Sequence, residues 1–131
     1  MIVLDTHVLI WWANGDARLS RAARKSIRSE QTDGVLAVSV ISAWEIALLV
    51  QKGKLALAMD VDAWLSAAMA LPRLRMVPIS QRVAVESTRL PGAFHADPAD
   101  RMIVALAREH DATLATADRR IRAYPHVRTI W

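Results

Sequence analysis

The chain opens with Met1-Ile2-Val3-Leu4-Asp5-Thr6, a short apolar run that stops at an acid. The run from Ile2 to Leu4 has the composition of a buried strand, and the polar pair behind it marks where that strand ends. Thr6 is suited to cap a helix that extends to about Asn14 and Gly15. The opening therefore predicts a strand, an acid at its carboxyl end, and then a helix.

This alternation of strands and helices continues along the chain. We expect further strands at Val35–Ser39, Met76–Ile79, Ala112–Ala115 and Val127–Ile130. We expect helices at Ser20–Ser29 (with Gln31–Gly34 as the turn that ends it), Val40–Lys52, from Asp60 to before Pro72, from Ser80 to before Pro91, at Asp97–His110, and a helical turn at Ala117–Arg122. Such alternation is typical of a mostly parallel sheet covered on both faces. The sequence thus predicts an α/β fold with a central sheet of four to five strands, in one domain over residues 1–131.

Composition limits the classes of protein that the chain can belong to. With 131 residues, 53% of them hydrophobic, it can fill one core. The absence of cysteine excludes disulfides, thiolate metal sites and a thiol nucleophile, and favours a reducing cytoplasm. We expect no secretory leader, because Asp5 follows so closely on the start, and no membrane span, because charged residues interrupt every apolar run before about 20 residues.

The charge balance is basic and consists mainly of arginine. Lys and Arg number 17 against 13 Asp and Glu, and only three of the 17 are lysines. The planar guanidinium of arginine suits phosphate groups, so a basic rim around an acidic pocket would fit a polyanion. A mildly basic surface without a ligand explains the same numbers equally well.

Four carboxylates lie beside the ends of apolar segments: Asp5, Glu45, Asp100 and Asp118. In open parallel sheets the ligand sits beyond the carboxyl ends of the strands, where we expect both Asp5 and the turn over Thr116–Asp118. Carboxylates gathered in one pocket repel each other, and Mg²⁺ or Mn²⁺ prefers such oxygen ligands. The acids therefore predict a bound divalent cation and the hydrolysis of a phosphodiester by metal-activated water.

Each acid also has a purely structural explanation. The negative charge of Asp5 could simply stabilise the N-terminus of the helix that follows it. Ser42 and Glu45 have the spacing of a capping box if a helix begins at Ser42, whereas a start near Ser39 leaves Glu45 in the second turn. The second start is the one that we expect.

The two remaining acid segments carry the same ambiguity. Asp97 stands before Pro98, which suits a helix cap as well as a metal ligand, so Asp100 is the stronger ligand candidate. Asp118 could likewise be a cap, and Thr116 could order a water or bond to the backbone. Arg101, Arg119 and Arg120 adjoin these acids, and we expect them to contact the substrate.

The chain resembles PIN domains, and among them the VapC-type toxins of bacterial toxin–antitoxin pairs, over nearly its whole length. The matching blocks are residues 1–12, Ser39–Leu55 with Trp44-Glu45-Ile46, Asp97–Ile103 and Leu114–Asp118. The resemblance implies an endoribonuclease that uses one or two Mg²⁺ or Mn²⁺ ions held by Asp5, Glu45, Asp100 and Asp118, with Thr6 and Thr116 as supporting hydroxyls. We expect Asp97 to have a supporting place beside them. The resemblance also implies an RNA substrate, a homodimer and a partner antitoxin.

Two other interpretations are compatible with the acids alone. The first is a Mg²⁺-dependent nuclease that acts on DNA. The second is a non-catalytic module, such as a receiver-like signalling domain, which is also a small α/β fold with acids around Mg²⁺. The receiver is disfavoured because Lys25, Lys52 and Lys54 all lie in the first half of the chain, away from the late strands where such a domain needs a lysine.

Overall fold

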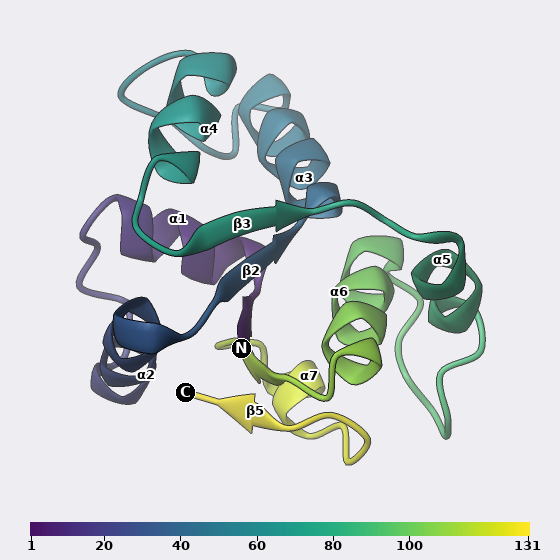
Figure 1. The fold of residues 1–131 in the computed structure, drawn as a ribbon. Helices are drawn as coiled ribbons and strands as arrows, with labels where there is room; N and C mark the ends of the chain where they lie inside the picture. Colours follow the sequence, from purple (N-terminus) through teal and green to yellow (C-terminus); the bar gives the residue numbers. More distant parts are fainter.

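Five short parallel strands form one sheet in the computed structural model, which describes residues 1–131 (Figure 1). The strands are β1 (Ile2–Leu4), β2 (Leu36–Ser39), β3 (Leu74–Val77), β4 (Thr113–Ala115) and β5 (Thr129–Ile130). Their order across the sheet is β3-β2-β1-β4-β5, and every neighbouring pair is parallel. The predicted α/β class with a parallel central sheet is confirmed.

Helices cover both faces of this sheet. They are α1 (Thr6–Ala13), α2 (Arg21–Asp33), α3 (Val40–Gln51), α4 (Val61–Met69), α5 (Gln81–Ser87), α6 (Pro98–Glu109) and α7 (Arg119–Arg122). Side chains of α1, α2, α3 and α4 form one core with the sheet, and those of α5, α6 and α7 form a second core. In Figure 1 the first group lies around β3 and the purple start of the chain, and the second group lies on the opposite side. None of the helices is both long and apolar enough to cross a bilayer.

The alternating direction of the side chains along the central strands explains why helices cover both faces of the sheet. In β1, Ile2 and Leu4 belong to the first core, whereas Val3 between them belongs to the second. Because successive side chains of a strand point to opposite faces, a strand with no polar residue must be covered twice. The sheet is therefore a middle layer between two layers of helices.

The strand order reverses direction between β1 and β4. From β1 the chain adds β2 and then β3 on one side, and β4 and β5 lie on the other. A crevice opens at such a switch point beyond the carboxyl ends of the two strands. Asp5 directly follows β1 and Thr116 directly follows β4, so the topology alone brings these two residues to the crevice.

Several local predictions were wrong. The last strand covers only Thr129–Ile130 of the predicted Val127–Ile130, and α7 begins at Arg119 instead of Ala117. The third strand lies at Leu74–Val77 instead of Met76–Ile79, because Pro78 has no N–H to donate to a neighbouring strand. α2 continues past Ser29 to Asp33, because its polar last turn stays helical until Gly34. α1 is capped by Asp5 and not by Thr6, whose side chain is directed elsewhere.

Candidate active site

The four acids that the sequence singled out line one pocket of about 300 Å³, although they are far apart in the chain. The lining residues are Asp5, Thr6, His7, Ile10, Glu45, Leu49, Asp97, Asp100, Asp118 and Arg120. They come from the ends of β1 and β4, from α1 and α3, and from the starts of α6 and α7. Folding thus concentrates acidic side chains at the switch point of the sheet.

Asp5 is the most buried of these acids, with 3% of its surface exposed. Its Oδ1 accepts a hydrogen bond from the Thr6 backbone N–H at 2.7 Å, and its Oδ2 accepts one from Thr116 Oγ1 at 2.7 Å. A carboxylate has about four acceptor positions, so both oxygens keep capacity for a further partner. Asp5 is therefore held in one orientation without being saturated.

Glu45 is held by the side chain of Thr6. Thr6 Oγ1 donates to Glu45 Oε1 at 2.5 Å, and it lies 2.8 Å from Ser42 Oγ. Because the single Thr6 hydroxyl proton goes to Glu45, Ser42 must be the donor in the second contact. Ser42 is fully buried, and its link to Thr6 was not anticipated from the sequence, in which it suggested only a capping box.

The capping-box alternative for Glu45 is wrong. α3 begins after Ser39, whose Oγ accepts from the Ile41 backbone N–H at 3.2 Å. Glu45 therefore lies in the second turn, as expected from the sequence, and faces the pocket. Its pKa is raised from 4.5 to about 7, first by burial and further by the charges of Asp5, Asp100 and Asp97, against the opposing hydrogen bond from Thr6.

The turn after β4 is tied to the end of β1 by side chains. Thr116 Oγ1, which donates to Asp5, also accepts from the Asp118 backbone N–H at 3.0 Å. The Ala117 N–H donates to His7 Nε2 at 2.9 Å, so the proton of the neutral His7 ring is on Nδ1, 3.6 Å from Asp5 Oδ2. His7 is thus an oriented neighbour of the acids.

Asp118 has two roles in the structure. It lines the pocket, and its Oδ1 caps α7 by accepting from the Arg120 backbone N–H at 2.8 Å. Partial burial acts to raise the pKa of Asp118, but the hydrogen bonds from Arg120 and Ile121 outweigh burial and lower the pKa below its usual value. Asp118 therefore remains ionised at neutral pH.

The start of α6 supplies two more acids with different contacts. Asp97 is the N-cap, and its Oδ1 accepts from the Asp100 backbone N–H at 2.9 Å. Asp100 Oδ2 lies 2.6 Å from His95 Nε2, a contact that sequence reasoning missed. Burial raises the pKa of Asp100, and the charges of Asp5 and Asp97 act in the same direction, while the hydrogen bond from His95 opposes them.

Of the three arginines expected to contact substrate, only Arg120 lines the pocket. Its Nη2 lies 3.5 Å from Asp118 Oδ2 and 3.9 Å from Asp100 Oδ2. Arg119 is exposed outside the pocket. Arg101 instead donates to three backbone carbonyls, those of Ser87 at 2.7 Å, Phe94 at 3.0 Å and His95 at 3.2 Å. These contacts give Arg101 a structural task, which is to hold the loop between α5 and α6.

The pocket fits a hard divalent cation by its chemistry and only partly by its geometry. No three acidic or histidine side chains lie close enough together to enclose an ion as they stand. Mg²⁺, however, needs only one or two carboxylates, because it keeps several of its waters. Burial raises the pKa values of Glu45 and Asp100, and the nearby charges of Asp5 and Asp97 raise them further, so a cation in this pocket would stabilise the ionised forms of both side chains. The donor set therefore fits such an ion.

Comparison with known proteins identifies the family. Residues 2–127 match the model of the PIN domain. This chain belongs to the PIN-domain family. It is 42% identical over 132 aligned residues to Ribonuclease VapC22 of Mycobacterium tuberculosis, an alignment that covers 99% of this chain and 98% of that protein. Identity at this level places this PIN domain in the VapC group.

Solved structures show the same fold. VapBC2 from Rickettsia felis, bound to a DNA fragment from its promoter, contains a chain that superposes on this PIN domain with a TM-score of 0.70 and 19% identity, over 99% of this chain and 98% of that chain. FitAcB from Neisseria gonorrhoeae gives a TM-score of 0.69 and 24% identity, over 100% and 97% of the two chains. The fold predicted from the resemblance is confirmed by both.

Proposed function

We propose that this protein is an endoribonuclease dependent on Mg²⁺ or Mn²⁺ that acts as the toxin of a toxin–antitoxin pair. The observation that carries the proposal is the gathering of Asp5, Glu45, Asp100 and Asp118 in one pocket at the switch point of the sheet. Its 42% identity to a protein named as a ribonuclease supports RNA as the substrate.

The side chains of the pocket have different roles in this proposal. Asp5 and Asp100 are the direct ligands of the ion in this proposal, and Glu45 and Asp118 order waters or hold a second ion. Thr6 fixes Glu45, and Thr116 fixes both Asp5 and the turn that carries Asp118. A bound Mg²⁺ or Mn²⁺ supplies a lowered pKa for water and positive charge against the phosphate that is being attacked.

Arg120 stands at the mouth of the pocket and is 64% exposed in its side chain. An exposed guanidinium next to the acids can bind a phosphate oxygen while the acids hold the ion. Arg119 is the next candidate for a phosphate contact, because it is exposed on the same short helix. Attack of an external water on the phosphorus with the 3′-oxygen as the leaving group gives a 5′-phosphate and a 3′-hydroxyl. Attack by the ribose 2′-hydroxyl would instead give a 2′,3′-cyclic phosphate and a 5′-hydroxyl, so the ends of the products distinguish the two mechanisms.

A second copy of the chain is the partner that α3 suggests. On its outer side Val40 is 39% exposed and Trp44 is 55% exposed, and these residues are one helical turn apart. An apolar patch of this kind on a helix is typical of a surface that is covered in the assembled protein. We propose that it lies in a homodimer, and that an antitoxin binds near the acidic pocket.

The receiver-like alternative conflicts with the sheet. Receiver domains have the strand order 2-1-3-4-5. The order here is β3-β2-β1-β4-β5, which places β2 between β1 and β3. The DNA nuclease alternative differs only in substrate, and competition between single-stranded RNA and DNA of the same sequence separates the two.

The test is cleavage of RNA by purified, antitoxin-free protein in the presence of Mg²⁺, Mn²⁺ or EDTA, with mapping of the product ends. We expect metal-dependent cuts with 5′-phosphate ends, and a loss of at least 100-fold in rate for Asp5→Asn and for Asp100→Asn. Asp33→Asn is the matched control, because Asp33 is an exposed acid at the end of α2 and does not line the pocket. Cleavage that survives EDTA or both pocket substitutions overturns the proposal.

A further inference from the structure

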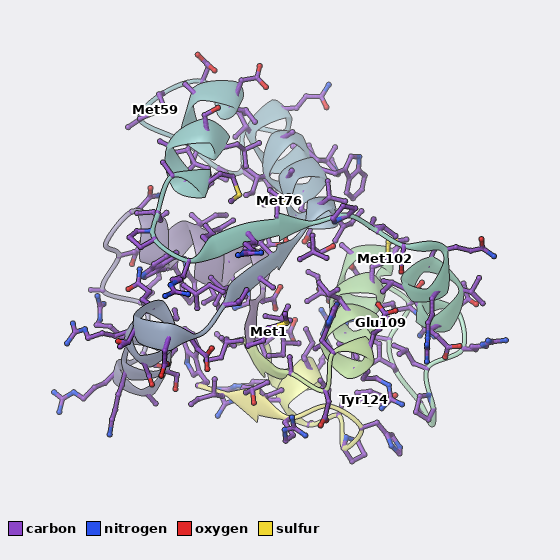
Figure 2. The ribbon with its side chains drawn as sticks, in the orientation of Figure 1. Met1, Met59, Met76, Met102, Glu109 and Tyr124 are labelled. Carbon is purple, nitrogen blue, oxygen red and sulfur yellow. The ribbon has the colours of Figure 1, made fainter.

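A second pocket of about 360 Å³ adjoins the acidic one, and its walls are mainly apolar. Ala93, Phe94, Ala123 and Tyr124 form these walls, and His95 and Arg120 lie among them. It lies between the loop that precedes α6 and the end of α7. Figure 2 labels Tyr124 just beyond α7, below the lower end of α6.

Two side chains connect this pocket to the acids. Arg120 lines both pockets, and its guanidinium is 3.5 Å from Asp118 Oδ2. His95 lines the apolar pocket, while its Nε2 is 2.6 Å from Asp100 Oδ2. A group in the apolar pocket is thus separated from the acidic pocket by a single layer of side chains.

The aromatic walls are held in place before any ligand binds. The rings of Phe94 and Tyr124 meet edge to face, with centroids 4.8 Å apart. The Tyr124 hydroxyl donates to the Pro91 carbonyl oxygen, and the Arg101 guanidinium lies 5.9 Å from the centre of the Phe94 ring while it donates to the Phe94 carbonyl oxygen. A flat ligand that enters therefore orders few additional side chains.

We propose that this pocket receives an unpaired nucleobase of the RNA, from a nucleotide next to the phosphate that is cleaved. Aromatic rings and arginine guanidinium planes are the groups on which proteins stack single-stranded bases. The half-buried Phe94 ring and the exposed Arg120 guanidinium are such groups here, whereas Tyr124, which is only 4% exposed, packs behind Phe94 and fixes its position. The charge pattern favours this ligand, because the sugar-phosphate chain can pass Arg120 from the apolar pocket to the cation held by the acids. The inference rests on the proposed function and adds to it a preference for unpaired RNA.

The experiment combines an occluding variant with abasic substrates. Ala123→Leu adds bulk to the pocket wall at an exposed position with ordinary helical backbone angles, so the fold should tolerate it. The probes are a fluorescent single-stranded RNA centred on a mapped cut and a set of copies with one abasic nucleotide at each position. Ala67→Leu, an equal change at an exposed position of α4, is the control.

For the wild-type protein and for Ala67→Leu, we expect one abasic position beside the cut to raise KM about tenfold, which is within the range for the loss of one stacked base. Ala123→Leu should raise KM on the intact RNA by a similar factor. With this variant, KM on that abasic copy should be little higher than KM on the intact RNA. Two results would overturn the proposed base pocket while leaving the nuclease assignment intact. One is an abasic nucleotide that raises KM equally in Ala123→Leu and in the wild type, and the other is a wild-type KM that no abasic position changes. A wild-type protein that cuts no RNA with either metal overturns the proposed function itself.

Discussion

Thr116 joins two parts of the site through one hydroxyl. It is fully buried, donates to Asp5 Oδ2 and accepts from the Asp118 backbone N–H. Replacing the hydroxyl by a methyl group keeps the volume and leaves both partners without their bond. The position of Thr116 after an apolar strand suggested a supporting role, but the double contact follows only from the three-dimensional register of β1 and β4.

We expect Thr116→Val to lower the free energy of unfolding by about 2 kcal/mol, because it leaves buried polar groups unsatisfied. RNA cleavage should fall at least tenfold, since both Asp5 and Asp118 lose their support. Urea denaturation and initial rates measure the two effects. Thr113→Val, three residues earlier at the start of β4 and without a side-chain hydrogen bond, should stay within about 0.5 kcal/mol of the wild type. A Thr116→Val protein that is as stable and active as Thr113→Val contradicts this role.

Glu45 predicts how the stability of the metal-free protein depends on pH. Its pKa is about 7 in the folded protein and 4.5 in the unfolded chain, so folding disfavours the charged form. The stability is therefore greatest below about pH 4.5 with respect to this group, falls as the pH rises, and has lost the full contribution above about pH 7. Burial of Asp100 acts in the same direction.

The measurement is urea denaturation in EDTA at pH 5 and at pH 8. Glu45→Gln removes the titrating group. Between pH 5 and pH 8 the free energy of unfolding should therefore fall less in this variant than in the wild type. Added Mg²⁺ should raise the melting temperature of the wild type more at pH 8 than at pH 5, because the ion competes with protons for the carboxylates. An identical pH dependence of stability in the wild type and in Glu45→Gln would contradict a raised pKa of Glu45 in the folded protein.

At the scale of elements, α6 shows how far the sequence can be interpreted. The Asp-Pro pair predicted a helix start, and the structure has Asp97 as N-cap and Pro98 in the first turn. The pattern could not show that His95 turns back onto Asp100, because that contact depends on the loop that Arg101 holds from inside α6. Caps are local and leave a mark in the sequence, whereas loop closure depends on distant packing.

The strands give the same lesson. β1 was predicted to the residue, because its apolar side chains are buried on both faces. β3 was displaced by two residues, because it is an edge strand in which only Leu74 is buried and the apolar signal is weak. The strand order could not be derived from the sequence, since alternating strands and helices permit several orders.

A pair of substitutions at Asp97 separates its two possible roles. Asp97→Ala removes the cap and should cost about 1 kcal/mol of stability, whereas Asp97→Asn keeps an acceptor for the Asp100 N–H and should be nearly as stable as the wild type. If Asp97 is mainly a cap, Asp97→Asn should retain most of the cleavage rate. A loss as large as that of Asp100→Asn would instead make Asp97 a ligand.

At the scale of the whole molecule, the exposed face of α3 predicts an assembly. We expect the wild-type protein to be dimeric in sedimentation equilibrium, and Trp44→Ser to shift it toward monomer, because a large apolar side chain is removed from the interface. Val85→Ser on α5 is the control, since Val85 is also an exposed apolar residue, with 42% of its surface accessible. A monomeric wild type, or a dimer that only Val85→Ser weakens, contradicts the assignment of this face.

The architecture as a whole brings acids from both halves of the chain to one edge of the sheet. Asp5 and Glu45 lie before the midpoint of the sequence and Asp100 and Asp118 after it, and the order β2-β1-β4 places their elements side by side. The proposed nuclease activity depends on a divalent cation binding where these acids meet. That dependence can be tested without RNA.

The most direct test is a crystal grown with Mn²⁺, with anomalous scattering used to locate the ion. We predict a peak within about 2 to 2.5 Å of oxygens of Asp5 and Asp100, and no such peak in crystals of Asp5→Asn grown in the same way. Well-ordered crystals in saturating Mn²⁺ with no ion in this pocket, or with the same peak in Asp5→Asn, would contradict the account.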